Sequence, residues 1–552
     1  MQKQVKLFAP YGLLVFSILV LWCGVYGKTS LSAWGAPPVY TGDSLLGYSL
    51  VKAASDGGSH WGGVLEAERL NAPFGGHWKG WPVVQDFWTA SLGKLALGLG
   101  LFEGINLFLV FSAVLSGCAF FYAARQTQAS TPLGLMGALL FAFCPFVEQQ
   151  LSSGTLPLVV TWPLPLMVLA FYWLNRHEFL VDEGWRIGCL LGLSVIVGAG
   201  QPVYSLIYVQ LLGFTVLANG FTGYRRKATV GVVMILVLVS VFGLVHFASL
   251  LNSFNQLVIS PNSLGLDLVQ GLQLANLFTP DQPGYLGLIG VFSLCWLVFE
   301  AAFIMLSKKP KQLSGFAGIA LWIFTYAVTG GVGSLLKQAG LPVFGLTDRY
   351  SGLLLAVLLL ALIARLSALL NRKQNWAFAG VLFLIGGAEQ FFLVSQNTAN
   401  LAQQDRSFAR SLEQHFEPGT ALFQLPVGPV KTQATRFGAV TKMEAFDPLR
   451  PYLFTKNLKF SFGGGYSQGD QKWQKNAENQ RPLKMIKQLQ AYGFKGLIIN
   501  WRAYPDFAHK LAFDLSKLGY KQLPTSVANR SLIAFDISKE PVIPPAQGHP
   551  QP

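Results

Sequence analysis

The chain has 552 residues, of which 52% are hydrophobic and only 12% charged, and its formal net charge is +15. Charged residues make up about a quarter of an average soluble protein, and the apolar residues here come in long uninterrupted runs, so the composition excludes an ordinary soluble fold. Much of the positive charge lies in short loops between those runs, where it controls membrane topology. We therefore expect a membrane protein with no nucleic-acid partner.

The first apolar run begins directly after a short basic segment. This run, Phe8–Tyr26, is longer than the core of a typical signal peptide, and Gly27–Ser30 is a poor cleavage site, so we expect a retained signal-anchor helix. Ten further runs follow, and because a helix of about 20 apolar residues crosses a bilayer, they predict about eleven transmembrane helices. Several runs are short, which indicates tilted or bent helices, and the fifth and sixth could form one broken helix around Gly198–Pro202. In chain order the predicted spans are Phe8–Tyr26, Ile105–Ala123, Leu133–Phe146, Leu156–Trp173, Ile187–Gly200, Val203–Ala218, Ala228–Phe247, Tyr285–Met305, Leu313–Val328, Tyr350–Leu370 and Trp376–Val394.

Clusters of basic residues fall mostly in alternate connections between these spans. The positive-inside rule places such connections, together with the N-terminus, in the cytoplasm. When the chain crosses the membrane in this orientation, four long segments lie on the outer face: the loop 27–104, the connections 248–284 and 329–349, and the tail from Ser395. A protein that only conducts or anchors does not need four substantial segments on one side, whereas an enzyme or receptor acting at that surface does. The clusters are Lys3 with Lys6, Arg125, Arg176 with Arg186, Arg225–Lys227, Lys308–Lys311 and Arg372–Lys373.

The first outer loop combines two amphipathic stretches with a segment rich in Gly and Trp. Ser44–Asp56 and Asp86–Leu101 predict helices that lie in the membrane interface. The segment between them contains His77 and Trp78. Tryptophans at a membrane surface commonly form an aromatic belt, which is the simpler interpretation. Gly, His and Trp in an irregular loop also suit a carbohydrate site, because an aromatic face packs on the apolar face of a sugar ring.

The tail differs in character from the rest of the chain. Short strand-like runs such as Thr420–Leu425 and Gly496–Ile499 alternate with helix-like stretches such as Arg481–Tyr492, which predicts a small α/β domain. All five cysteines lie in or beside apolar runs, so no disulfide framework supports this domain. We expect a transmembrane domain over 1–394, a soluble α/β domain over 395–540 and a disordered Pro-rich end over 541–552.

Sequence motifs for nucleotide and zinc chemistry are absent. The chain has no Gly-rich loop followed by Lys-Ser or Lys-Thr and no His-Glu-x-x-His. ATP-driven transport and zinc-dependent hydrolysis therefore have no support.

Asp43 is the leading acidic candidate. It lies just outside the first span, where the membrane surface meets water, and a carboxylate there suits a general base that takes a proton from an acceptor hydroxyl. Asp is also a favoured N-cap, so Asp43 can cap a helix that begins at Ser44, and both roles stay open. Asp86 begins the second amphipathic helix, and we interpret it first as a first-turn carboxylate favoured by the helix dipole.

Arg349 is the leading cationic candidate. It sits at the outer end of the tenth span, on the side that the positive-inside rule disfavours, and a guanidinium there can bind a phosphate through two parallel hydrogen bonds. The simpler alternative is an ion pair with Asp348 or with a lipid phosphate. Lys337 is a weaker second cation in the same loop.

The order of these features resembles the polytopic type C glycosyltransferases (GT-C), which use lipid-linked sugar donors. The resemblance covers most of 8–394 and, more loosely, the tail, where Asp447–Tyr452 resembles bacterial members. The matching features are Asp43 after the first helix, Asn71–Gly75 in the first loop, Phe143–Phe146 at a helix end, Tyr285–Gly287 at a helix start, and Arg349 opening a late helix before a soluble domain.

The resemblance implies a GT-C-like membrane fold and an inverting transfer of a sugar from a polyprenyl-phosphate-linked donor to a glycan, lipid or protein acceptor on the outer face. Asp43 would be the catalytic base and Arg349 would bind the donor phosphate. It also implies a multi-pass protein among the lipids of a bacterial inner (plasma) membrane, with a cytoplasmic N-terminus and a periplasmic or extracellular tail. Further substrate-binding candidates are Asp86, His77, Trp78, Lys337 and Tyr285.

One departure from the family pattern concerns metals. Many type C relatives carry two adjacent acids after the first helix, whereas Asp43 has none beside it. No cofactor is certain, a divalent metal is left open, and Asp86 or Asp56 are the candidate partners of Asp43.

Two other functions compete with catalysis. A transporter or flippase of lipid-linked sugars or polysaccharide would need ionisable residues in mid-span, and Arg365 and Glu389 are the main examples. An assembly scaffold would recruit partners through its tail, and its outer-loop acids would be dispensable.

Overall fold

The structure is a computed structural model of the chain. It describes all residues except 1, 41, 59–64, 79–86, 176–183, 260–271, 281, 308–313, 340–346, 394–397, 428–433, 436–437, 440–442, 445, 464–470, 502, 504–506, 524–530 and 541–552. The candidate Asp86 and the end expected to be disordered therefore lie outside the described residues.

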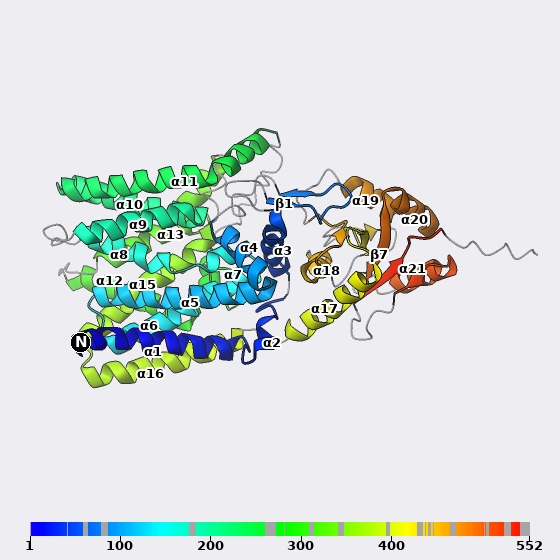
Figure 1. Cartoon of the computed structure of the whole chain (residues 1–552). Helices are drawn as coiled ribbons and strands as arrows, with labels where there is room; N and C mark the ends of the chain where they lie inside the picture. Colours follow the sequence, from blue (N-terminus) through cyan, green and yellow to red (C-terminus); the bar gives the residue numbers. More distant parts are fainter. Residues whose placement is uncertain are drawn as a thin grey trace, which may run out of the picture.

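Most of the helices lie side by side in an elongated bundle, and the C-terminal region sits at one end of it (Figure 1). In the described part of the chain, six helices are long and apolar enough to cross a membrane, and four shorter apolar helices accompany them. The chain is therefore a multi-pass helical membrane protein. The bundle helices are α1 Gln2–Val25, α5 Leu101–Gln126, α6 Thr131–Ala142, α7 Pro145–Ser152, α8 Pro163–Asn175, α9 Gly184–Ala199, α10 Pro202–Phe221, α11 Arg225–Ile259, α12 Gly287–Ser307, α13 Ser314–Ala327, α15 Ser351–Leu369 and α16 Arg372–Leu393.

Each predicted span overlaps a helix, but prolines shift several edges. The span predicted over 133–146 is broken before Pro145, which begins α7, because a proline disfavours helical geometry in the residue before it. The span predicted over 156–173 is wrong at its start, where a single 3-10 turn, η3 Leu156–Val159, precedes α8. The expected break near Gly198–Pro202 is confirmed, since α9 ends at Ala199 and α10 begins at Pro202. Helix α11 extends into the region expected to be a loop after residue 247.

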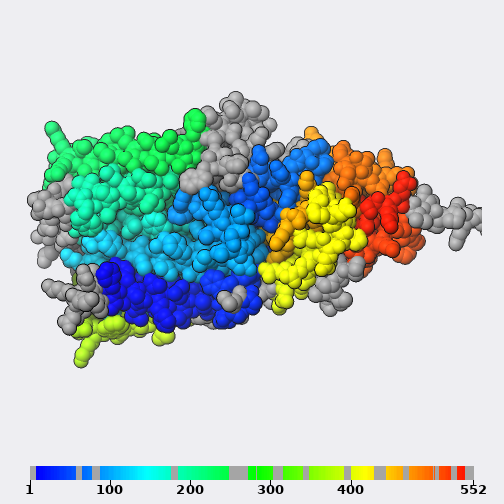
Figure 2. All heavy atoms as spheres, viewed as in Figure 1, coloured from blue at the N-terminus to red at the C-terminus, as the bar shows by residue number. Residues whose placement is uncertain are grey.

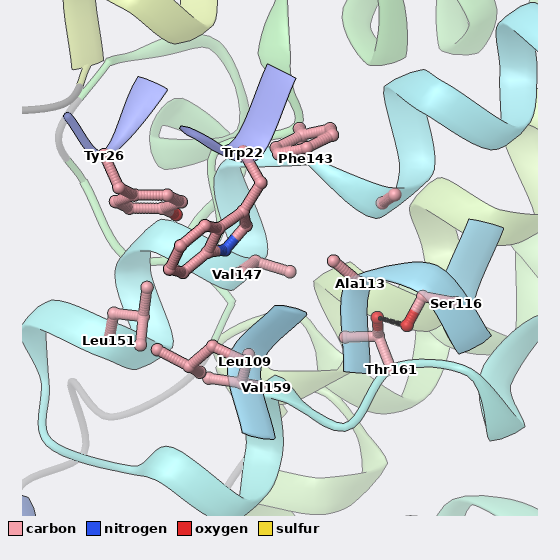
Figure 3. A pocket seen from close by; sticks show the side chains of 11 residues that line it. Trp22, Tyr26, Leu109, Ala113, Ser116, Phe143, Val147, Leu151, Val159 and Thr161 are labelled. Atoms are coloured by element: carbon pink, nitrogen blue, oxygen red, sulfur yellow. Dashed lines mark hydrogen bonds between the residues drawn. The ribbon is translucent and has the colours of Figure 1, made fainter. Parts of the chain in front are cut away.

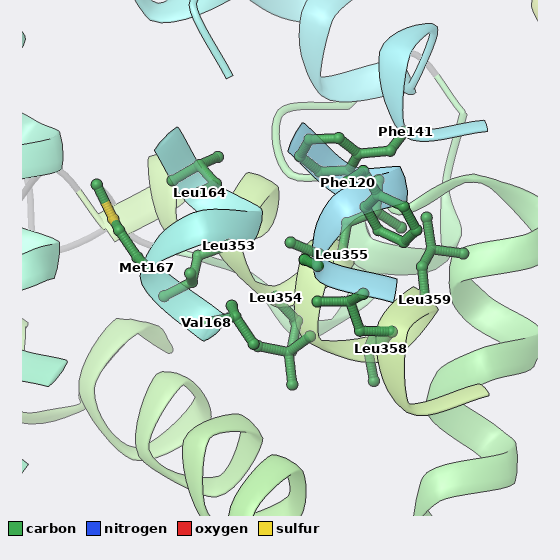
Figure 4. Close-up of a cluster of buried hydrophobic side chains, with 14 of the residues drawn as sticks. Phe120, Phe141, Leu164, Met167, Val168, Leu353, Leu354, Leu355, Leu358 and Leu359 are labelled. Carbon is green, nitrogen blue, oxygen red and sulfur yellow. The ribbon is translucent and has the colours of Figure 1, made fainter. Parts of the chain in front are cut away.

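Helix α15 lies in the core of the bundle. Its residues from Ser351 to Leu360 are all buried, so this stretch has no polar face and is surrounded by neighbouring helices. Its leucines pack with Phe120 of α5, Phe141 of α6 and Leu164 of α8 (Figure 4). Van der Waals packing of this kind is a main force that holds transmembrane helices together.

The C-terminal region is built around a five-stranded mixed sheet with the strand order β6-β3-β7-β9-β8. Strand β3 runs parallel to β6 and β7, whereas β9 runs antiparallel to β7 and β8. The predicted α/β character is confirmed, and both predicted strands and the predicted helix are present. The strands are β3 Ala421–Leu425, β6 Lys459–Phe460, β7 Phe494–Asn500, β8 Lys521–Gln522 and β9 Leu532–Asp536, with a separate pair β4 Ala434–Thr435 and β5 Gly438–Ala439. The helices are α17 Thr398–His415, α18 Arg450–Phe454, α19 Gln471–Glu478, α20 Pro482–Ala491 and α21 Phe507–Lys517.

The first loop lies between the bundle and the C-terminal region, where Figure 2 shows its blue surface against the yellow and orange surface of the tail. Its Leu46 and Leu65 share one apolar core with Phe408 and Tyr452 of the C-terminal region. The loop and the tail therefore form one packed layer. The loop elements are α2 Leu31–Trp34, α3 Ser44–Ala53, π-helical η1 Ala54–Gly58, β1 Leu65–Ala67, β2 Gly76–Trp78 and α4 Phe87–Leu99.

The backbone of the first loop also pairs with the edge strand of the sheet. The Phe460 N–H donates to the Arg69 carbonyl at 2.7 Å, and the Ala72 N–H donates to the Phe460 carbonyl at 2.9 Å. Arg69 adds a side-chain hydrogen bond from Nε to the Leu458 carbonyl at 3.0 Å. The loop thus covers the edge at β6, an edge that would otherwise present unpaired backbone groups.

Helix α3 forms where an amphipathic helix was expected, but it does not lie on a membrane surface. Nine of its ten residues are buried, because it packs against α4 and α5 on the bundle side and against α18 of the tail. The interfacial placement is therefore wrong for α3. Helix α4 keeps exposed apolar side chains such as Leu97 and Leu99, which suits contact with lipid.

Candidate functional site

A cavity of about 530 Å³ lies where the bundle, the first loop and the C-terminal region meet. Its volume falls within the usual range for small-molecule sites, about 300–1,000 Å³. The walls come from α3 and α4, from α7 and the turn after it, from the segment before α12, from the turn before α15 and from Phe446. We call it the Asp43 cavity.

Asp43 lines this cavity from the N-terminal end of α3. It occupies the N-cap position, but its side chain makes no capping hydrogen bond to the described amides of the first turn. The preceding Gly42 has a φ of +53°, a left-handed conformation that glycine adopts without strain. This turn leads the chain into α3 and places the Asp43 residue at the cavity wall.

Two glycines hold α3 directly against the turn that follows α7. Gly154 has a φ of +70°, and a Cβ on it would collide with the carbonyl of Asp43. A Cβ on Gly47 would in turn collide with the carbonyl of Gly154. The two backbones are therefore in contact, and this contact fixes the main chain of Asp43 relative to α7.

Amide and hydroxyl side chains of α7 and its following turn form one wall of the cavity. Gln149 accepts a hydrogen bond from the Gly284 N–H at 3.1 Å and donates to the Gln282 carbonyl at 3.0 Å, which ties α7 to the segment before α12. The Thr155 hydroxyl donates to Oε1 of Gln150 at 2.6 Å. Groups that both donate and accept hydrogen bonds are suited to the hydroxyls of a sugar.

Arg349 lines the same cavity from the 3-10 turn η7 Thr347–Tyr350, which leads into α15. Its Nη1 is buried and has no hydrogen-bond partner among the described residues. A buried polar group without a partner is costly, so this position favours an anionic ligand that accepts the hydrogen. The structure thus brings Asp43 and Arg349, the two leading candidates from distant parts of the sequence, to one cavity.

The C-terminal region also reaches this cavity. Phe446 lines it, and the carboxylate of Glu444 accepts a hydrogen bond from the N–H of Gly42, next to Asp43. No motif or periodic pattern in the sequence marks Glu444 or Phe446 as site residues. The one signal nearby is the motif Asp447–Tyr452, which follows this segment directly.

Asp56, a candidate partner of Asp43, lies in η1, beyond the opposite end of α3. It forms ion pairs with Arg69 at 2.7 Å and Lys52 at 3.7 Å, and it accepts a hydrogen bond from the Tyr452 hydroxyl at 3.3 Å. Burial lowers the pKa of the Lys52 ammonium to about 8, although the charge of Asp56 opposes that shift. Asp56 is therefore a structural ion-pair partner and does not accompany Asp43.

The candidates Tyr285 and Lys337 are not among the described residues that line the Asp43 cavity. The Tyr285 hydroxyl donates to Oε1 of Glu389 at 2.6 Å, and the same carboxylate accepts from the Leu288 N–H at 2.9 Å at the start of α12. Lys337 lies in the last turn of α14 Val332–Gln338. Substrate contacts of Tyr285 and Lys337 stay predictions.

His77 and Trp78 lie on β2, whose backbone pairs with β1 beside the C-terminal region. Among the described residues, no group of three or more His, Cys, Asp or Glu side chains is placed to hold a metal ion. Because Asp86 lies outside that part of the chain, this observation does not test the divalent metal that the sequence left open.

A second, much smaller cavity of about 10 Å³ lies within the bundle, where α1 meets α5 and α7. Figure 3 shows apolar side chains such as Trp22 and Val147 around it. The hydroxyls of Ser116 and Thr161, which line it, hydrogen-bond to each other at 2.9 Å. It has room for about one water molecule and is a packing gap.

No protein-family model matches the chain, and no curated protein matches it either. Among solved structures, ArnT from Cupriavidus metallidurans bound to undecaprenyl phosphate matches 96% of this chain and 98% of that chain, with a TM-score of 0.51 and 14% identity. The fold is that of a type C glycosyltransferase. This confirms the resemblance seen in the sequence, at the level of fold.

Two other solved structures match at lower scores. The oligosaccharyltransferase AglB from Archaeoglobus fulgidus, in complex with an inhibitory peptide and a dolichol-phosphate, matches 94% of this chain and 73% of that chain, with a TM-score of 0.44 and 12% identity. The arabinofuranosyltransferase AftD from Mycobacteria has a TM-score of 0.46 and 12% identity over 97% of this chain. The chain spans 42% of the length of AftD.

Proposed function

We propose that the protein is a membrane glycosyltransferase that moves a sugar from a polyprenyl-phosphate donor to an acceptor hydroxyl on the extracytoplasmic face. The observation that carries this proposal is the placement of Asp43 and Arg349 on one cavity of about 530 Å³ at the end of a type C fold. The bound undecaprenyl phosphate of ArnT supports a lipid phosphate as the donor group.

In this proposal Arg349 binds the donor phosphate. Its unpartnered Nη1 supplies a hydrogen bond, and its charge offsets the charge that develops when the bond between the anomeric carbon and the phosphate oxygen breaks. The electron pair leaves with the phosphate, and the polyprenyl chain lies along the apolar surface of the bundle.

Asp43 acts as the general base. It accepts the proton of the acceptor hydroxyl as that oxygen bonds to the anomeric carbon on the face opposite the phosphate, so configuration inverts. Gln149, Gln150 and Thr155 on the neighbouring wall hold the hydroxyls of the sugar ring.

The proposed orientation follows from the basic clusters. Helix α1 begins at the end of the bundle farthest from the C-terminal region, where Figure 1 marks the N-terminus. The positive-inside rule assigns this end to the cytoplasm. The Asp43 cavity then opens on the extracytoplasmic side, within reach of an exported acceptor.

The test is turnover by the purified protein with polyprenyl-phosphate sugars, followed as release of polyprenyl phosphate. We expect Asp43→Asn to lower kcat by about 10²–10⁴-fold with little change in the donor KM, because only proton transfer is lost. Arg349→Ala should lower kcat/KM for the donor by about 10²–10³-fold. Arg349→Lys should fall in between, since it keeps the charge and loses the forked geometry.

Glu66→Gln is the matched control, because it neutralises an exposed carboxylate on the same loop, in β1. Its turnover should stay within about twofold of wild type. Full turnover in both Asp43→Asn and Arg349→Ala would overturn the site assignment. Movement of the lipid-linked sugar across liposomes, with no release of polyprenyl phosphate from any donor, would instead identify a transporter.

A further inference from the structure

A buried ion pair of the C-terminal region contacts the segment that carries Asp43. Arg450 of α18 donates from Nε and Nη2 to the two carboxylate oxygens of Asp405 of α17, at 2.6 and 2.8 Å. The side chains are 1% and 0% exposed. The Tyr40 hydroxyl of the first loop donates to the same carboxylate at 2.8 Å. Only two residues separate Tyr40 from Asp43 in the sequence.

The guanidinium of Arg450 keeps its charge in this buried position. Burial opposes the charge of Arg450, yet the facing carboxylate of Asp405 raises the pKa of the guanidinium above its usual value. Burial and the same carboxylate raise the pKa of Tyr40, so the phenol keeps its proton and stays a donor.

Stability alone is a weak explanation for this arrangement. Buried ion pairs often contribute less to stability than apolar residues of similar volume, because both charges lose their hydration. Here Nη1 of Arg450 is also buried without a hydrogen-bond partner among the described residues. Such pairs are better explained where they define one geometry.

The geometry defined here is that of the chain leading to Asp43. Tyr40 is fixed by Asp405, Gly42 donates its N–H to Glu444, and α18 packs against α3. Asp43 lies within about 10 Å of chain from Tyr40, so the contacts at Tyr40, Gly42 and α3 together restrict its position. Misplacement of a reacting group by about 1 Å can cost about 10²-fold in rate.

We propose that Asp405 and Arg450 of the C-terminal region are positioning residues that hold Asp43, through Tyr40, in its reactive place. The inference rests on the proposed function, since it explains how the tail completes the transferase site. It assigns the C-terminal region a role in the chemistry itself, in addition to any contact with the acceptor.

The decisive variant is Tyr40→Phe, which removes one hydroxyl and leaves the ion pair intact. We expect kcat to fall about tenfold while the donor KM stays within twofold, because Arg349 is untouched. Amide hydrogen exchange at Leu45, Leu46 and Gly47 should rise at least about fivefold. These amides donate to the carbonyls of Gly42 and Asp43 in the first turn of α3, so they report the order of that turn.

Tyr452→Phe is the matched control. Like Tyr40→Phe, it removes a hydroxyl that donates to a carboxylate across the contact between the tail and the first loop. Its partner Asp56, however, lies in η1, beyond the end of α3 that is far from Asp43. Both kcat and the exchange of the three amides should stay within about twofold of wild type.

Unchanged kcat and unchanged exchange in Tyr40→Phe would overturn the inference. Equal losses in Tyr40→Phe and Tyr452→Phe would overturn it too, since any damage to the contact between loop and tail would then suffice. If wild-type protein releases no polyprenyl phosphate, the proposed function fails by itself, and hydrogen exchange still decides whether Tyr40 orders the turn at Asp43.

Discussion

The helical bundle and the outer layer formed by the first loop and the C-terminal region are held together by different interactions. In the bundle, leucines and other apolar side chains around α15 fill the core, and several buried hydroxyls bond back to their own helix, such as Ser293 to the Ile289 carbonyl. In the outer layer, charged and aromatic side chains join segments hundreds of residues apart, such as Tyr40 and Asp405.

This difference shows where the molecule tolerates change. Apolar contacts depend on volume and accept many combinations of side chains, whereas a buried charged contact needs both partners in one geometry. The Asp43 cavity lies where the two regions meet. One of its sides is therefore a packed scaffold, and the other is fixed by specific pairs.

The largest effect on stability should come from breaking the charged contact of the outer layer. Asp405→Ala leaves the Arg450 guanidinium buried and without its partner, which should lower the free energy of unfolding by about 3–5 kcal/mol. Thermal or denaturant unfolding of the purified proteins measures this loss. Glu417→Ala, which removes an exposed pair with Lys495, should have almost no effect. A loss below about 1 kcal/mol in Asp405→Ala would contradict the contrast between the two regions.

A glycine substitution tests the backbone contact at the cavity. Gly154→Ala forces a side chain into a left-handed conformation and against the carbonyl of Asp43, which should cost about 2 kcal/mol or more and abolish turnover. Gly213→Ala in α10 is the bundle counterpart, because nothing lies within 4 Å of the added methyl. It should be neutral or slightly stabilising, as alanine favours helix. Similar unfolding and turnover in the two variants would refute the tight contact.

The smallest effect concerns pH. The folded pKa of Lys52 is about 8, against about 10.4 in an unfolded chain. Between those values the unfolded chain binds more protons at this site, so stability rises with pH, while below about pH 8 the buried charge carries its full cost. The free energy of unfolding of wild type, relative to that of Lys52→Met, should therefore rise by about 1–2 kcal/mol between pH 7 and pH 9.5. Denaturant unfolding of both proteins at the two pH values measures this change. An equal difference at both pH values would show that Lys52 is not buried as a cation.

The bundle could be predicted from the sequence because each span carries its own signal, a run of apolar residues of the right length. The errors arose at Pro145 and Pro163, where an apolar run continues through a break in the helix. The burial of α3 could not be predicted, since its outer face is covered by residues of α18 that are far away in sequence.

The candidate site, like the fold, could be predicted only in part from the sequence. Asp43 and Arg349 are ionisable groups that the sequence predicts to lie at the membrane surface, so their position singled them out, although their roles stay predictions. Gln149, Glu444 and Phe446 have ordinary sequence surroundings and reach the cavity or its rim only through tertiary contacts. No local pattern distinguishes such residues.

The shared core of the first loop and the tail has a consequence for biosynthesis. Asp405 is made 365 residues after Tyr40, which corresponds to roughly 20–70 s at about 5–20 residues per second. During that interval α3 has been synthesised, but the tail that covers Leu46 and Ala53 does not yet exist. The nascent chain must pass this period with the apolar side chains of α3 uncovered, so the first loop needs lipid or chaperone contact during assembly.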